Sequence, residues 1–165
     1  DGGHSGDNLG LLPLLQRRCR LILAVDAEQD PEYRCASLMS AIRYAEVDLG
    51  IRVDLGLAPL RPDSSGQAPC HFAIGKIHYP HIAGTPAQDG YLVLLKSSIT
   101  TADAAPIQQF RLSHPGYPQE STADQFFGED QFEAYRQLGR ALAESLLAAH
   151  PELEHGEISP GPGSP

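Results

Sequence analysis

The sequence of 165 residues contains no apolar run close to the roughly 20 residues that a membrane-spanning helix needs. Its longest apolar stretches, residues 21–25 and 91–95, have the length of strands. Positive charge is also scarce, because 12 Lys and Arg residues stand against 21 Asp and Glu residues. A chain with net charge −9 lacks the clustered basic surface that nucleic-acid binding requires, so nucleic acid is excluded as its main partner.

Cysteine is the next scarce residue type. Cys19, Cys35 and Cys70 make an odd count, and no C-x-x-C spacing occurs. A disulfide framework is therefore disfavoured and a reducing compartment is favoured. Isolated cysteines in apolar segments are typical small core residues, so we assign them no catalytic role.

The first half of the chain predicts helix and strand in alternation. "LLPLLQRR" indicates a short helix with Pro13 in its first turn and with Arg17 and Arg18 in its last turn. "CRLILAVDA" is a compact apolar run that predicts a buried, parallel strand ending on Asp26. Residues 36–49 carry apolar side chains on one helical face and end at Gly50, and "IRVDLGL" predicts a short strand.

The second half predicts a strand pair and a long closing helix. "CHFAIGKIHY" and "GYLVLLKS" form the pair, joined by a connection over residues 80–90, and the second strand is apolar on both faces. Residues 104–112 indicate one more helix. A capping pattern, Asp130 with Glu133, predicts a helix to about residue 149. Its expected apolar face comprises Phe132, Tyr135, Leu138, Leu142 and Leu146. Residues 150–165 are rich in Gly and Pro and predict a disordered tail.

This order of elements is an α/β layer pattern, with residues 1–149 as the folded part. The first helix has no strand before it, although a crossover helix in a parallel sheet should leave one strand and enter the next. We therefore expect that Asp1 is a cut end and that the sheet lacks upstream strands. An exposed apolar surface should mark the place of those strands.

The opening "DGGHSGDNLG" permits four interpretations. As a plain turn it is rich in Gly, Asp and Asn, with Asn8 as a local helix cap. A calcium loop fails, because Gly3 and Leu12 stand where ligands are needed. A serine elbow around Ser5 fails too, because Asp7 replaces its last glycine and no strand precedes it. The fourth interpretation makes Asp1 a base that can take a serine proton directly.

A resemblance favours the fourth interpretation. "DGG", followed after four residues by "NLGLLPLLQRRCRLILAVDA", resembles the C-terminal part of the patatin-like phospholipases. "CHFAIGKIHYP", "GYLVLLKSSIT" and "YPQESTADQFF" resemble a bacterial branch of that family. The similarity runs from Asp1 to about residue 149. It implies a three-layer α/β/α hydrolase fold with a mixed sheet, of which this chain is the C-terminal portion.

The family resemblance also implies site residues. Asp1 matches the catalytic aspartate of a Ser–Asp dyad, and Gly2 and Gly3 complete its motif. Asn8 matches a motif-adjacent Asn that shapes the helix start, and His4 is a candidate for the mouth of the site. The nucleophilic Ser and the oxyanion glycines belong before Asp1. The chain would then be part of a lipid acyl hydrolase that needs no cofactor or metal, and alone it should have no esterase activity.

Other candidate sites and functions remain beside this one. His78 and His81 are spaced like a metal-ligand pair, but solvated histidines are the default interpretation. Asp26 ends a strand where ligands gather in α/β sheets, or it caps the following loop. Residues 124–127 suit a packed helix start better than a substrate contact. A non-catalytic binding or scaffolding domain and a receiver-like regulatory domain are the alternative functions, although neither Lys76 nor Lys96 fits a receiver well.

The expected partners follow from the hydrolase hypothesis. They are a lipid or ester substrate and the missing N-terminal half of the same domain. A cytoplasmic or membrane-associated location is favoured. A membrane surface stays open as a partner, although no basic amphipathic segment argues for one. The acyl chain and head group are not specified by the sequence.

Overall fold

A four-stranded mixed sheet forms the centre of the computed structural model, which describes residues 7–121, 123 and 126–158. The strand order is β1 (Leu21–Asp26), β4 (Gln88–Lys96), β3 (Phe72–Tyr79) and β2 (Arg52–Asp54). β1 runs parallel to β4, whereas β3 is antiparallel to both β4 and β2. The expected α/β class with a mixed sheet is thus confirmed.

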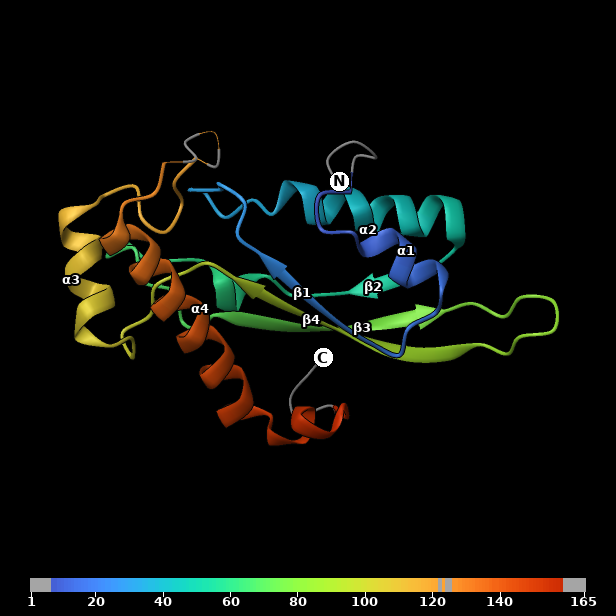
Figure 1. Cartoon of the computed structure of the whole chain (residues 1–165). Coiled ribbons are helices and arrows are strands. Elements are labelled where there is room, and N and C mark those ends of the chain that lie inside the picture. Colours follow the sequence, from blue (N-terminus) through green and yellow to red (C-terminus); the bar gives the residue numbers. More distant parts are fainter. Residues whose placement is uncertain (1–6, 122, 124–125, 159–165) are drawn as a thin grey trace.

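Helices lie on both faces of this sheet (Figure 1). On one face lie α1 (Leu11–Gln16) and α2 (Ala36–Leu49). On the other lies α4 (Glu129–Ala149), with α3 (Ala105–Ser113) beside it. Two 3-10 helices, η2 (Ala58–Leu60) and η3 (Pro151–His155), complete the described elements. The arrangement is three layers, helix on sheet on helix.

Two hydrophobic cores follow from these layers. Alternate side chains of a strand point to opposite faces, so Leu92 and Leu94 of β4 join the core under α1 and α2. Val93 and Leu95 join the core under α4, with Leu138 among its helical members. β4 is therefore buried on both faces, as its sequence predicted. Buried apolar area of this kind contributes about 25 cal/mol per Å².

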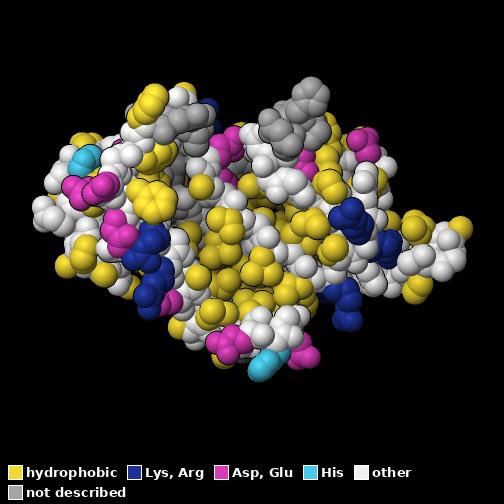
Figure 2. All heavy atoms as spheres, viewed as in Figure 1, with side chains coloured by type: hydrophobic (Ala, Val, Ile, Leu, Met, Phe, Trp, Pro, Cys, Tyr) yellow, Lys and Arg dark blue, Asp and Glu magenta, His cyan; other side chains and the backbone are white. Residues whose placement is uncertain are grey.

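β1 departs from the expectation of a fully buried strand. Ile22 and Ala24 are buried toward α1 and α2, but Leu23 and Val25 on the opposite face are 52% and 67% exposed. Among the described strands only β4 pairs with β1, so its other edge carries no partner. Figure 2 shows apolar side chains gathered beside α4 on this face of the molecule. An apolar run in the sequence can thus form an edge strand of which one face, here the face with Leu23 and Val25, is not packed against a helix.

The helix ends also correct the sequence-based expectations. α1 ends at Gln16, so Arg17 and Arg18 lie beyond its last turn, and Arg18 adopts a left-handed φ of 57°. α4 begins at Glu129 after Gly128, which places Asp130 inside the first turn rather than at the cap. Phe132 is 65% exposed and does not share the buried face of Leu138, Leu142 and Leu146.

The chain between and after these elements is more ordered than its composition predicts. β4 already begins at Gln88, so the connection from β3 covers residues 80–87. η3 lies within the segment that we expected to be a disordered tail, and Leu153 and Ile158 pack against the second core. The packing of these two side chains explains how order extends past residue 150.

Candidate functional site

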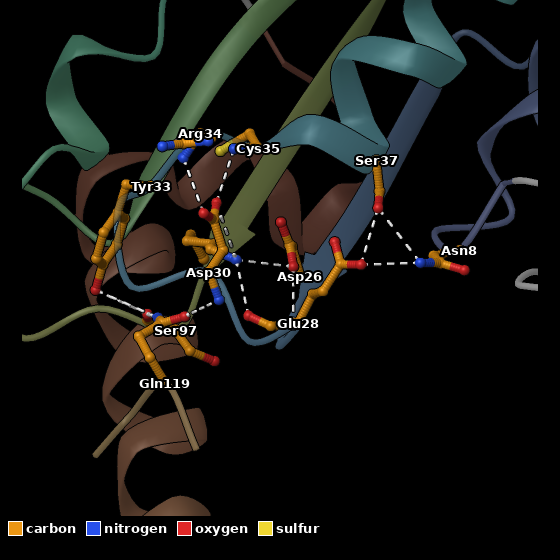
Figure 3. Close-up of polar contacts among 11 residues, drawn as sticks. Asn8, Asp26, Glu28, Asp30, Tyr33, Arg34, Cys35, Ser37, Ser97 and Gln119 are labelled. Carbon is orange, nitrogen blue, oxygen red and sulfur yellow. Dashed lines mark hydrogen bonds and ion pairs between the residues drawn. The ribbon is translucent and has the colours of Figure 1, made fainter. Parts of the chain in front are cut away.

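The predicted catalytic motif and its immediate successor, Asp1, Gly2, Gly3 and His4, lie outside the described residues. Asn8 is the first predicted site residue that the structure places. Its Nδ2 donates to Glu28 Oε1 at 2.9 Å and to Ser37 Oγ at 3.3 Å, and Ser37 Oγ also donates to Glu28 Oε1 at 2.9 Å (Figure 3). Asn8 thus joins the loop after β1 to the first turn of α2.

Asn8 does not cap α1, as the turn interpretation assumed: the N-cap residue is Gly10, and the side chain that reaches the first turn is that of Asp7. Asp7 Oδ2 accepts a hydrogen bond from the Leu12 N–H at 2.6 Å, and the Asp7 carbonyl accepts one from Gly10 N–H at 3.1 Å. Asp7 is 2% exposed, and its Oδ1 has no hydrogen-bond partner among the described residues. The signal in the sequence was an Asp shortly before an apolar helix, a residue type whose carboxylate accepts from N–H groups of a first helical turn. Because Asp7 makes this contact, the Asn8 side chain binds Glu28 and Ser37 instead.

A buried ion pair lies at the carboxyl ends of β1 and β4. The parallel register sets Asp26 directly opposite Lys96, and both side chains point to the α1–α2 face. Lys96 Nζ donates to Asp26 Oδ1 at 3.0 Å and to the Glu28 carbonyl at 3.1 Å, and Asp30 Oδ2 lies 4.0 Å away. The side chains of Lys96 and Asp26 are 0% and 2% exposed. Such a pair is stable because each charge is matched by hydrogen bonds.

The loop that follows β1 is shaped by carboxylates around this pair (Figure 3). Glu28 N–H donates to Asp26 Oδ1 at 2.9 Å, and the two oxygens of Asp30 accept from the N–H groups of Arg34 and Cys35 at 3.0 and 2.7 Å. Cys35 adopts a left-handed φ of 50°, as does Tyr33 in the same loop. Non-glycine residues with such φ values are held by surrounding contacts and concentrate at functional sites.

Gln119 connects this loop to the other half of the chain. Its Oε1 accepts from Asp30 N–H at 2.8 Å, and its Nε2 donates to the Ser97 carbonyl at 2.5 Å and to Tyr33 Oη at 3.3 Å. Tyr33 Oη itself donates to the Ser97 carbonyl at 3.2 Å. Burial raises the pKa of the Tyr33 phenol, so it stays a neutral donor. Sequence reasoning gave Gln119 no role, because a lone Gln in a loop carries no pattern.

Burial also argues against two other reactions, one at a reactive Cys35 thiolate and the other at Asp26 as a phosphate acceptor. It raises the pKa of the Cys35 thiol, which disfavours a reactive thiolate and agrees with the core role assigned to this residue. Asp26, the acidic residue of the receiver alternative, is engaged by Lys96 and by the Glu28 N–H and is closed to solvent. A phosphoryl donor would have to displace these contacts to reach it.

A second buried cluster has the residue types of a serine hydrolase. His71 Nδ1 lies 3.1 Å from Ser98 Oγ, and His71 Nε2 lies 3.0 Å from Asp103 Oδ1. Ser98 is 0% exposed and the His71 and Asp103 side chains are 4% and 2% exposed, so a substrate cannot reach the hydroxyl. Asp103 Oδ2 accepts from Thr100 N–H at 2.7 Å. The cluster fixes the turn after β4.

The histidine spacing considered for metal binding does not bring His78 and His81 together as ligands. His78 instead bridges two neighbouring strands, with Nε2 2.9 Å from Asp54 Oδ2 and Nδ1 3.2 Å from Asp89 Oδ1. Over the described part of the chain, no group of three or more His, Cys, Asp or Glu residues is arranged to hold a metal ion.

Comparison with known proteins gives no match to a family model, a curated protein or a solved structure. Within the ranges that the structure describes, no helix has both the length and the apolar character to cross a bilayer. The geometry of the chain itself therefore carries the functional interpretation.

Proposed function

We propose that this chain is the C-terminal portion of a patatin-like lipid acyl hydrolase and that Asp1 is the base of its Ser–Asp dyad. The observation that carries the proposal is the anchoring of Asn8 at the carboxyl end of the sheet. Asn8 follows the DGG motif in the sequence, and it bonds to Glu28 directly beyond β1. In open α/β sheets, reactive groups gather at the carboxyl ends of the strands.

The open edge of β1 supports the same proposal. A strand whose apolar side chains Leu23 and Val25 are half exposed, and whose outer edge is unpaired among the described strands, suits pairing with a further strand. A strand followed by a helix would pair with the edge and cover both side chains. An N-terminal half of the same domain is the occupant that we propose, since it would bring the serine and the oxyanion-stabilising groups.

The chemistry of the complete site would be acyl transfer in two steps. The serine hydroxyl attacks the ester carbonyl while Asp1 takes its proton, and backbone N–H groups stabilise the oxyanion. The alcohol leaves with that proton, and water, activated by Asp1, then releases the acid from the acyl-enzyme. Asn8, Glu28 and Ser37 are positioning residues in this scheme, because they hold the chain next to the motif without contacting the substrate.

The decisive experiment uses a longer protein that joins this chain to the N-terminal half that the proposal requires. We expect Asp1→Asn to lower kcat for a nitrophenyl ester about a thousandfold or more, since a dyad cannot work without its base. Asp48→Asn, an exposed substitution on α2 with the same change of charge, should leave kcat unchanged. The 165 residues alone should show no turnover. Turnover by those residues that Asp1→Asn abolishes would refute the proposal.

A non-catalytic scaffold is the second candidate, and the exposed β1 face favours it equally well. A fluorophosphonate probe separates the two functions. Covalent labelling of a serine in the longer protein supports the hydrolase. A correctly folded longer protein that takes up no probe and hydrolyses no ester supports the scaffold.

A further inference from the structure

A pocket of about 640 Å³ opens beside the Gln119 network, and the proposed function gives it no role. Four segments form its walls: the loop after β1, residues 61–66 after η2, Arg111 of α3, and residues 115–119 after α3. Its volume lies in the range of small-molecule sites. The floor is preformed, because Tyr33 and Gln119 are tied to each other and to the Ser97 carbonyl.

Two arginines from different segments line this pocket, although the chain as a whole is acidic. Among the described residues, Arg111 donates one hydrogen bond, from Nη2 to the Ser65 carbonyl at 2.8 Å, which leaves most of its five N–H groups available there. Arg61 forms no side-chain hydrogen bond or ion pair with any residue in the described ranges. A guanidinium group can bind two phosphate oxygens at once through its parallel N–H groups.

Arg111 lies against the backbone of the loop that carries Gly66. A Cβ atom at Gly66 would meet Arg111 Nη2 in its present place, and the φ of Gly66 is +74°, a conformation that favours glycine. Together with the hydrogen bond from Nη2 to the Ser65 carbonyl, this close approach places the guanidinium at the pocket wall.

The carboxylates on the rim are already engaged. Glu32 forms an ion pair with Arg34. Asp63 Oδ1 accepts from Ser65 N–H, Ser65 Oγ and Gln67 N–H at 2.8, 2.5 and 3.2 Å. Among the residues that line the pocket, Arg61 and Arg111 stand against Glu32 and Asp63, so the formal charge of the lining is balanced.

We infer that this pocket binds a phosphate ester, with Arg61 and Arg111 on the phosphate. The rest of the wall suits the organic part of such a ligand, because four prolines and two tyrosines contribute to it. They are Pro31, Pro62, Pro115, Pro118, Tyr33 and Tyr117. The ester is either a free small molecule or the head group of a lipid, and both share the recognised chemistry. The inference requires no turnover and is independent of the hydrolase proposal.

Calorimetric titration of the 165-residue chain with glycerol 3-phosphate tests the inference. We expect saturable binding with one site per chain. Arg61→Gln and Arg111→Gln should each weaken it about tenfold or more, because each removes charge-assisted hydrogen bonds. Arg43→Gln makes the same change of charge on α2, away from the pocket, and should leave the affinity unchanged.

Gly66→Ala supplies an independent variant that keeps both arginines. Its Cβ would meet Arg111 Nη2 in its present place, so the guanidinium must shift, and binding should weaken, though less than in Arg111→Gln. Circular dichroism confirms that each variant is folded. Dihexanoyl phosphatidate, a soluble lipid, distinguishes the two sources. Tighter binding than glycerol 3-phosphate indicates a lipid head group, and equal binding indicates a free phosphate ester. Absence of saturable binding of either compound up to ~20 mM, or equal weakening by Arg43→Gln, overturns the inference.

Discussion

The two lysines of this protein form the same kind of ion pair in opposite surroundings. Lys96 and Asp26 lie 3.0 Å apart with side chains 0% and 2% exposed, whereas Lys76 and Asp89 lie 2.7 Å apart with side chains 44% and 52% exposed. The shorter of the two ion pairs, Lys76–Asp89, is the solvent-exposed one. Burial rather than distance therefore decides which pair the fold depends on, because water can replace a lost partner only at the surface.

The neighbours of each pair show the same contrast. Lys96 also binds the Glu28 carbonyl, and so it holds the loop that carries Asp30 and leads to α2. Asp89 also contacts His78, but this contact spans exposed strand residues that are already joined by backbone hydrogen bonds. The buried pair therefore holds the loop after β1 in place, whereas the exposed pair adds a surface contact to strands that are already paired.

The largest expected effect comes from removing the buried cation. Lys96→Met should lower the free energy of unfolding by about 3–5 kcal/mol, because Asp26 would be left charged, buried and unpaired. Lys76→Met is the matched control and should cause a much smaller loss. Urea unfolding followed by circular dichroism measures both. Equal losses would mean that burial does not separate the two pairs.

A medium effect is expected from the residue that joins the loop to the second half of the chain. Gln119→Leu should cost about 1–3 kcal/mol, because Asp30 N–H would lose its acceptor and the Ser97 carbonyl one of its donors in a buried site. Gln109→Leu, on an exposed position of α3, is the control and should have little effect. Urea unfolding followed by circular dichroism measures both variants. If Gln119→Leu leaves the free energy of unfolding unchanged, water must replace the lost hydrogen bonds of the network.

The smallest expected effect concerns the exposed pair and pH. The hydrogen bond from Lys76 holds the pKa of Asp89 below its ordinary value of 3.8. A carboxylate with a lowered folded pKa contributes stability above the unfolded pKa, and this contribution is lost as the pH falls through the folded value. In Lys76→Met the pKa of Asp89 should return toward 3.8.

An NMR titration of the carboxyl carbons measures this return, and Asp63 provides an internal control. The pKa of Asp63 is lowered chiefly by the Ser65 hydroxyl, so it should stay unchanged in the variant. An Asp89 pKa that does not move would indicate that His78, rather than Lys76, holds the carboxylate charged.

The spacing of apolar residues in the sequence predicted where helices and strands form, but it predicted less well which of their faces are buried. The α2 pattern predicted both the helix and its buried face, including Leu38 and Ala41, because an amphipathic helix records its orientation in its own sequence. The apolar run of β1 predicted a strand but not its edge position. Exposure of Val25 depends on which segments cover the sheet, and a local pattern does not contain that information.

The candidate site was less predictable than the fold. Asp26 was identified from its place at a strand end, but its partner Lys96 follows only from the register of β1 against β4. The roles of Gln119, Arg61 and Arg111 depend on loops that meet in space without any sequence period. Sequence reasoning also gave Asn8 the contact with the start of α1 that Asp7 makes, since both residue types favour such contacts.

The parallel pairing of β1 with β4 also has a consequence for how the chain folds. β3 and β4 are neighbours joined by a short connection, whereas Asp26 and Lys96 are 70 residues apart in sequence. Closing a long loop costs more entropy than forming a hairpin, so β1 should dock after the antiparallel strands have formed. The network that carries the candidate site would then be the last part of the sheet to assemble, and partial opening would expose it before the β3–β4 hairpin separates.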